Sequence, residues 1–205
     1  MNAPAFSERR AFDPLLRLIH AWNALAIVGL GLSAQLAEAF EHGPWEDVIW
    51  RSHVQFGYAL VGGLALRLVW GLVGPEFARW ADLWHPRAWS QVLRGRFAIP
   101  PRFGHDAKAS AAFLALYAVL LLMAATGLPL AAVEFGMGPF AGVLDESSGL
   151  KHLLKEPHEA GFALVLGFIA LHLGALAYHR FVLGAPVGQA MVTGMQRLPQ
   201  ETNHA

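Results

Sequence analysis

The histidines are the residues of this chain best suited to chemistry, because few other side chains in it could bind a transition metal. The 205 residues include ten histidines and no cysteine. Without cysteine, the chain can form no disulfide, thiolate zinc site, iron–sulfur cluster or covalent c-type haem attachment. A metal or redox centre held by this chain must therefore rely mainly on imidazole.

Four histidines of the long apolar runs are the most informative, because an ionisable side chain there is costly and usually functional. They are His20, His53, His158 and His172. His158 and His172 are fourteen residues apart, which at 100° per residue falls about 40° short of four helical turns. The two rings therefore share one helix face, about 21 Å apart along the helix axis. This spacing predicts two stacked sites.

The elements that would position these histidines are four transmembrane helices. Hydrophobic residues make up 55% of the chain and charged residues 15%, against roughly 45–50% and 25% in an ordinary soluble domain. Four long apolar runs approach or exceed the ~20 residues that a spanning helix needs; they cover about residues 15–37, 53–73, 108–130 and 158–183. The sequence predicts one integral membrane domain over residues 1–205, an all-α, up-down-up-down four-helix bundle.

The distribution of positive charge predicts the orientation of the helices. Formal net charge is zero, so composition gives no electrostatic case for nucleic acid. Twelve of the fifteen Lys and Arg residues lie at the start of the first run or before it, around the connection from the second run to the third, or at the end of the fourth run and after it. By the positive-inside rule both termini are cytoplasmic, and loops 38–52 and 131–157 face outward.

The connection over residues 75–104 is long and basic, and it carries Trp80, Trp84 and Trp89. Trp and Arg both favour the headgroup region of a membrane. We therefore expect a short amphipathic helix at the membrane interface in this cytoplasmic loop. A disordered loop is the alternative.

Helix direction predicts which histidines lie at the same depth. His20 lies near the cytoplasmic start of the first run, and His172 lies on the cytoplasmic half of the fourth. His53 and His158 both lie where their runs begin at the outer surface. The predicted pairs are therefore His20/His172 and His53/His158. Two imidazoles across a bundle suit the axial positions of a low-spin haem iron, whereas a structural zinc site wants four ligands.

Three further polar residues are candidates for contacts to such a cofactor. Arg17 and Arg67 could approach haem propionates through charge-assisted hydrogen bonds. Extension of the side chain to the membrane interface is the alternative for both. His179, seven residues after His172, could contact a propionate or a quinone headgroup, or serve only as an interface residue.

Two glycines stand one helical turn after a predicted ligand. Gly57 follows His53 by four residues, and Gly161 follows His158 by three, so each lies on the same helix face as its histidine. The missing side chain could leave room for a planar haem. Close packing of helices is the alternative, since glycine commonly serves it in membranes.

The remaining histidines lie outside the four runs. His105, near the start of the third run, is the substitute ligand if His20 fails. The other four are expected in loops or tails and exposed to solvent: His42, His85, His152 and His204.

With these residues placed, the chain resembles the prokaryotic cytochrome b561 family, which includes the b-type cytochrome subunits of nickel–iron hydrogenases. The resemblance covers about residues 12–196 and is carried by FDPLLRLIHAWNAL, RSHVQFGYALVGGLALRLVWGLVGP, HEAGFALVLGFIALHLGALAYHR and AMVTG. GHDAKA, at residues 104–109, resembles the entrance to the family's third span, although Asp106 and Ala107 replace its usual asparagine and proline.

The resemblance implies a dihaem b-type cytochrome of the bacterial inner membrane that carries electrons between the quinone pool and a periplasmic donor or acceptor, as a respiratory-chain component. Its haem ligands would be His20, His53, His158 and His172. The partner would be a cytochrome c or an oxidoreductase subunit such as a hydrogenase, while some relatives act alone and oxidise superoxide with quinone as acceptor. Enzymatic activity of the chain itself stays open, and no catalytic residue is predicted.

Two other classes of protein compete with this interpretation. Intramembrane histidines also relay protons or bind metal in transporters. A non-redox anchor subunit would use the same four helices. A transporter site should converge near the membrane centre, whereas the four histidines here are predicted to lie in two layers.

Overall fold

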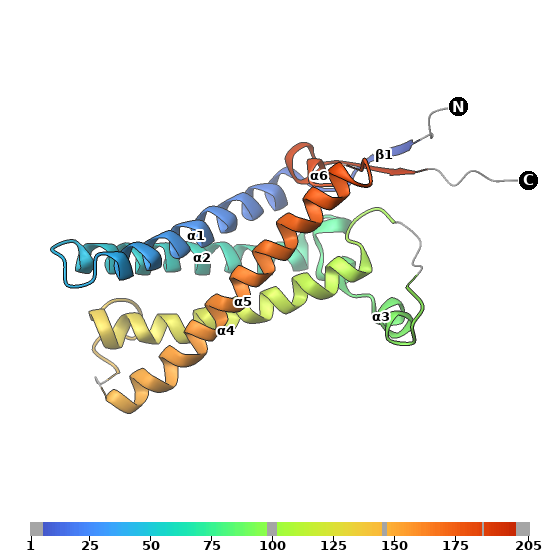
Figure 1. Ribbon diagram of the computed structural model, residues 1–205. Coiled ribbons are helices and arrows are strands. Elements are labelled where there is room, and N and C mark those ends of the chain that lie inside the picture. The colour runs from blue at the N-terminus through green and yellow to red at the C-terminus, as the bar shows by residue number, and fades with distance from the viewer. Residues whose placement is uncertain (1–5, 98–101, 145–146, 186, 200–205) are drawn as a thin grey trace, which may run out of the picture. The chain divides into compact units, whose positions relative to one another are not determined.

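The protein is mostly helical, with four long helices, in the computed structural model, which describes residues 6–97, 102–144, 147–185 and 187–199. These helices are α1 (Pro14–Ala39), α2 (Glu46–Val73), α4 (Ala107–Phe135) and α5 (Ser148–Phe181) (Figure 1). All four are long and apolar enough to cross a membrane. The predicted all-α membrane fold is therefore confirmed.

The fourth helix begins earlier than the apolar pattern predicts. α5 starts at Ser148, ten residues before the predicted run, because charged residues can continue a helix when their side chains lie in solvent. Lys155 pairs with Glu159 at 3.6 Å, and His152 lies 3.4 Å from Glu156, each one turn along the same face. His152 is exposed as expected, but it lies on a helix and not in a loop.

The connection between α2 and α4 contains three short helices: η1 (Glu76–Ala78), η2 (Trp80–Leu83) and α3 (Pro86–Leu93). Pro86 occupies the first turn of α3, where its missing N–H costs nothing. Trp89 and Val92 are half-buried, whereas Arg87 and Gln91 are exposed. The predicted short amphipathic helix is therefore present, in place of a disordered loop.

Two terminal strands pair, which the apolar pattern does not predict. β1 (Phe6–Arg10) and β2 (Met195–Pro199) form an antiparallel ladder. The short helix α6 (Gln189–Thr193) precedes β2 and ends at Gly194, whose φ of +82° suits glycine. The Gly194 carbonyl accepts hydrogen bonds from the backbone N–H groups of Ala11 and Phe12, so the C-terminal segment is fixed to the N-terminal one.

The chain folds as two compact units. The first unit comprises residues 1–18, 68–115 and 170–205, and the second comprises residues 19–67 and 116–169. Phe12, Leu16 and Phe77 lie in the buried core of the first unit, together with Ala78 and Ala190.

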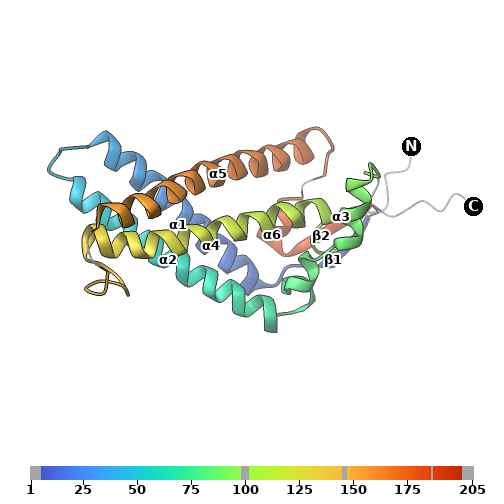
Figure 2. The same ribbon diagram turned by 90° about the horizontal axis from the view of Figure 1, so that it is seen from below.

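Within the second unit, segments of all four long helices pack around a core that includes Leu60, Leu64, Leu120 and Val165. Helices that follow one another in the chain run antiparallel. In their contacts, a later residue on one helix meets an earlier residue on the next. On α1 and α2, for example, the Trp22 side chain bonds to Ala59 while Ser33 meets His53. Figures 1 and 2 show these segments side by side within the unit.

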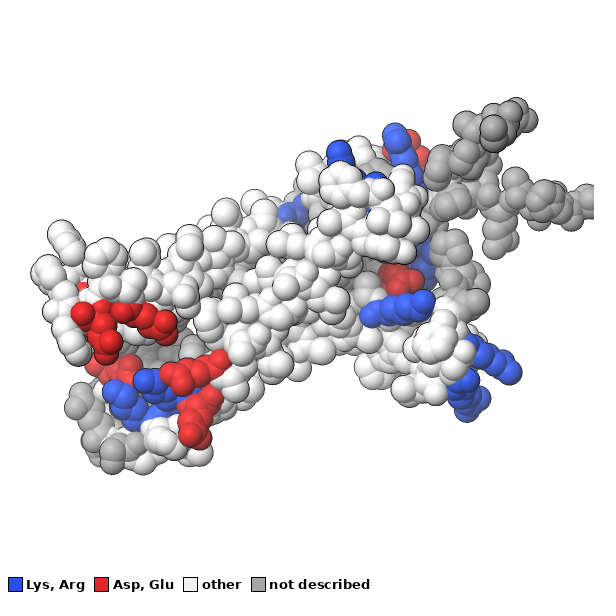
Figure 3. All heavy atoms as spheres, viewed as in Figure 1, with Lys and Arg blue, Asp and Glu red and all other residues white. Residues whose placement is uncertain are grey.

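Charge differs between the two units. The first unit carries eleven Lys and Arg residues against six Asp and Glu, and the second carries four against nine. Along most of the long helices the surface in Figure 3 has no charged side chain. Large apolar residues of these helices are exposed, such as Leu25 at 71% and Leu72 at 73%, as expected for helices that face lipid.

Candidate functional site

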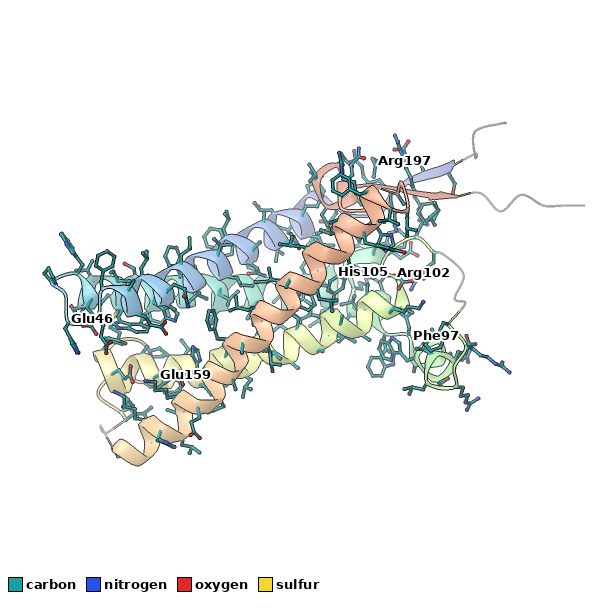
Figure 4. All side chains as sticks on the ribbon, viewed as in Figure 1. Glu46, Phe97, Arg102, His105, Glu159 and Arg197 are labelled. Carbon is teal, nitrogen blue, oxygen red and sulfur yellow. The ribbon has the colours of Figure 1, made fainter. Side chains whose placement is uncertain are left out.

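Two of the four predicted ligands, His53 and His158, are neighbours within the second unit. His53 lies near the start of α2, and His158 lies on α5 beside Glu159, which Figure 4 labels. Both rings are half-buried, and they are close enough to interact electrostatically. Their pairing as ligands of one haem stays a prediction.

The Nδ1 atom of His53 is held by the neighbouring helix α1. It lies 3.1 Å from the carbonyl oxygen of Leu30 and 3.1 Å from the hydroxyl oxygen of Ser33. A carbonyl oxygen has no hydrogen to donate, so Nδ1 must carry the proton. The other ring nitrogen, Nε2, is then the one with a free lone pair.

His158 is held by α4 in the same way. Its Nδ1 lies 2.9 Å from the hydroxyl oxygen of Thr126, and the ring also hydrogen-bonds to the backbone of Met123. Among the described residues, no hydrogen bond reaches Nε2 of either His53 or His158. Both rings therefore present an open Nε2.

Gly127 makes room for the ring of His158. A Cβ atom at Gly127 would lie 2.9 Å from Cε1 of His158, closer than ordinary van der Waals contact allows. Sequence reasoning missed Gly127, as it missed Ser33 and Thr126. The sequence signal that could have indicated Ser33 and Thr126 is a hydroxyl side chain within a strongly apolar run.

The other predicted ligands fall in different units. His172, in the first unit, is half-buried and makes an edge-to-face contact with Phe113, with ring centroids 6.0 Å apart. His20, in the second unit, lies on an exposed position of α1. Their pairing stays a prediction.

Arg17 contacts the C-terminal end of α6. Its guanidinium donates to the backbone carbonyls of Met191, at 3.2 Å, and of Val192. A cation is favourable at this position, because the last carbonyls of a helix lack partners and carry partial negative charge. Arg17 thus fixes the C-terminal segment, and its contact with a propionate stays a prediction.

Arg67 and His179 have different surroundings. Arg67 is only 3% exposed, and its Nε donates to the hydroxyl of Tyr117 at 3.1 Å. The Arg67 side chain is thus packed inside the protein and does not extend to its surface. His179 lies in the last turn of α5, half-buried beside the ring of Tyr178. Their contacts to a cofactor or quinone stay predictions.

The two predicted haem-packing glycines are in contact with neighbouring helices. A Cβ atom at Gly161 would lie 2.8 Å from Met123, so this glycine allows α5 to approach α4 closely. At Gly57 the same atom would be 4.0 Å from Leu30, an ordinary contact. The structure thus shows the helix-packing role for Gly161.

A polar cluster in the first unit centres on Asp82, which sequence reasoning did not single out. This buried carboxylate accepts hydrogen bonds from Arg102, at 2.7 Å, and from the backbone N–H and Nδ1 of His105, at 2.9 and 2.7 Å. Figure 4 labels Arg102 and His105. The predicted substitute ligand His105 is therefore held by a carboxylate, beside the rings of Phe12 and Phe113.

The remaining histidines were expected to be solvated. His42 is exposed, as predicted. His85 lies in a loop, as predicted, but it is only partly exposed, and Arg102 approaches its ring nitrogens at 2.8 and 3.1 Å. His204 lies outside the described residues.

Four helices long and apolar enough to span a membrane, with two neighbouring imidazoles held through Nδ1, are typical of membrane proteins that bind a metal-centred cofactor through histidine. The family model of prokaryotic cytochrome b561 matches residues 11–194. The chain belongs to this family and is a transmembrane b-type cytochrome that transfers electrons and binds haem b. No curated protein matches the chain.

His53 and His158 fit the haem that the family implies. Haem iron takes neutral imidazole through one nitrogen while the other ring nitrogen donates a hydrogen bond that orients the ring. The Nδ1 contacts on α1 and α4 give both rings this form. The donor set therefore matches a bis-imidazole site.

Proposed function

We propose that this protein carries electrons across the bacterial inner membrane, between the quinone pool and a periplasmic donor or acceptor, through two haem b groups. The observation that carries the proposal is the pair His53/His158, with both Nδ1 atoms donating and both Nε2 atoms open. His20 and His172 would hold the second haem. Each bound haem b supplies a one-electron carrier whose iron changes oxidation state without binding substrate.

The protein around this site would hold the ligands and exclude water. The core of the second unit provides an apolar setting of low dielectric constant, one of the means by which a protein tunes a haem potential. Arg67, which is buried fourteen residues after His53 on α2, would neutralise a propionate of the other haem, the one held by His20 and His172.

We further propose that residues 1–205 act as one membrane domain with both termini in the cytoplasm. Each long helix runs through both compact units. The pairing of β1 with β2 supports placing the two ends of the chain on the same side of the membrane. The excess of Lys and Arg in the first unit favours the cytoplasmic side for that unit.

Quinone is the proposed exchangeable substrate, with His179 as a candidate contact to its headgroup. The periplasmic partner would be a cytochrome c, another oxidoreductase subunit or a small oxidant or reductant such as superoxide. A quinol gives up two electrons and two protons, whereas a haem takes one electron at a time. Residues near the quinone must therefore also accept protons.

The proposal is tested with the purified protein in vesicles that enclose ferricyanide, with a soluble quinol added outside. We expect the trapped ferricyanide to be reduced at least tenfold faster than in protein-free vesicles. His53→Ala should abolish this gain, and His152→Ala, at an exposed position, should retain it. Equal rates in vesicles with and without the wild-type protein would overturn the proposal.

A further inference from the structure

Two buried hydroxyl groups make matching contacts with the two histidines of the second unit. Ser33 on α1 lies 3.1 Å from Nδ1 of His53, and Thr126 on α4 lies 2.9 Å from Nδ1 of His158. Ser33 is 4% exposed and Thr126 is 6% exposed. Each histidine thus contacts a hydroxyl on the long helix that precedes its own.

The direction of these hydrogen bonds follows from the other contacts of the hydroxyls. Ser33 Oγ lies 2.7 Å from the carbonyl oxygen of Gly29, and Thr126 Oγ1 lies 2.9 Å from that of Leu122. A hydroxyl has one hydrogen, which is directed to these carbonyls, so its lone pairs face the imidazole. The rings donate and the hydroxyls accept.

Each hydroxyl already has a hydrogen-bond acceptor other than the histidine. A Ser or Thr inside a membrane helix is commonly satisfied by a carbonyl one turn earlier in the same helix. Ser33 and Thr126 both have that bond already. Their contacts with the imidazoles are therefore additional, and they occur at both histidines of one predicted pair.

We propose that Ser33 and Thr126 are positioning residues for the haem held by His53 and His158, orienting the ring of each ligand and lowering the reduction potential of that haem. This inference rests on the proposed function. An acceptor at Nδ1 increases the electron density that imidazole gives to iron, which favours the oxidised state. Two such acceptors, one on each axial ligand, act in the same direction.

Loss of one hydroxyl should change the potential without releasing the haem. His53 retains the Leu30 carbonyl as acceptor, and His158 retains its bond to the backbone of Met123. Each ring therefore keeps a backbone hydrogen-bond partner when the hydroxyl is removed. The expected change is electronic, because the ligand itself stays in place.

The test is a redox titration of the purified full-length protein, with low-temperature electron paramagnetic resonance as a second readout. Ser33→Ala and Thr126→Val remove the hydroxyls with little change of volume. We expect both variants to retain all haem and to raise the potential of the same haem, so that its ratio of oxidised to reduced form at fixed potential falls several-fold. His53→Ala identifies that haem, because its signal disappears.

Three variants serve as controls. Ser110→Ala removes a fully buried hydroxyl from α4, which bonds to neither histidine among the described residues, and it should leave both potentials unchanged. Ser33→Thr and Thr126→Ser retain the hydroxyl and should restore the wild-type potential. Because the two sites are tested independently, failure of one variant to fold leaves the other as a full test.

Two results would overturn the inference. In one, Ser33→Ala and Thr126→Val retain both haems with unchanged potentials and resonance spectra. In the other, the two variants shift different haems. A wild-type protein without a bis-imidazole haem would instead contradict the proposed function, so the two failures are distinguishable.

Discussion

A histidine offers two ring nitrogens, and the partner of one determines what the other can do. At His53 the carbonyl of Leu30 and the hydroxyl of Ser33 engage Nδ1, and at His158 the hydroxyl of Thr126 engages Nδ1, which leaves Nε2 for a metal. The same imidazoles without these partners would populate both tautomers. The ability of His53 and His158 to bind iron therefore depends on Ser33 of α1 and Thr126 of α4, although neither hydroxyl would itself be an iron ligand.

The pairing of ligands can be tested by single and double substitution. If His53 and His158 hold one haem, His53→Ala and His158→Ala should each lose that haem, and the double variant should lose nothing more. Haem per chain, measured as the pyridine haemochrome, is the readout. His172→Ala should lose the other haem.

His152→Ala is the matched control, since His152 lies on α5 but is exposed. It should retain the full haem content. A double variant of His53 and His158 that loses more haem than either single variant would contradict the pairing.

The packing of α4 against α5 determines where the ring of His158 can lie. Gly127 follows Thr126 directly, so one turn of α4 provides both the hydrogen-bond acceptor and the open space. A larger residue at this position would force the ring away from Thr126. The hydrogen bond and the packing therefore position His158 jointly.

We expect Gly127→Leu to weaken the haem held at His158 by about tenfold, because the new side chain overlaps the imidazole. Haem retention during dilution of the purified protein measures this. Gly167→Leu is the control, since Gly167 lies on α5 and a Cβ atom there would meet nothing within 4 Å among the described residues. Equal haem retention in the two variants would show that the close contact at Gly127 has no effect.

The segment before α4 depends on Asp82, which gathers Arg102 and His105 by hydrogen bonds. Asp82→Asn removes the charge and leaves donors without a full set of acceptors, so we expect a loss of about 1–3 kcal/mol in stability. Thermal unfolding followed by tryptophan fluorescence measures it. Glu76→Gln, which affects an ion pair whose side chains are 54% and 70% exposed, should change stability very little. The reverse order of the two effects would refute this role for Asp82.

Hydropathy predicted the four long helices, because a long apolar run is a property of one segment. The alternating direction of these helices then predicted that His53 and His158 lie at the same depth. The start of α5 at Ser148 was missed, since charged turns continue that helix beyond its apolar part. Ser33 and Thr126 could not be assigned to their histidines, because each contact joins two helices in a register that sequence alone does not fix. The pairing of β1 with β2 likewise depends on distant segments.

At the scale of the whole molecule, the uneven distribution of charge predicts how the chain sits in the membrane. The absence of native cysteine allows a direct test with single introduced cysteines. Glu41, after α1, and Arg94, after α3, are both exposed. In intact cells, a membrane-impermeant maleimide should label Glu41→Cys and not Arg94→Cys, until the cells are opened. The opposite labelling would reverse the proposed orientation.

The proposed electron transfer across the membrane requires two haem b groups in one chain, each with two imidazole ligands. The most direct measurement is haem quantitation on the purified protein, combined with its low-temperature electron paramagnetic resonance spectrum. We predict two haems per chain, both low-spin, with signals of bis-imidazole ligation. One haem per chain, no haem, or a high-spin signal from the intact protein would contradict it.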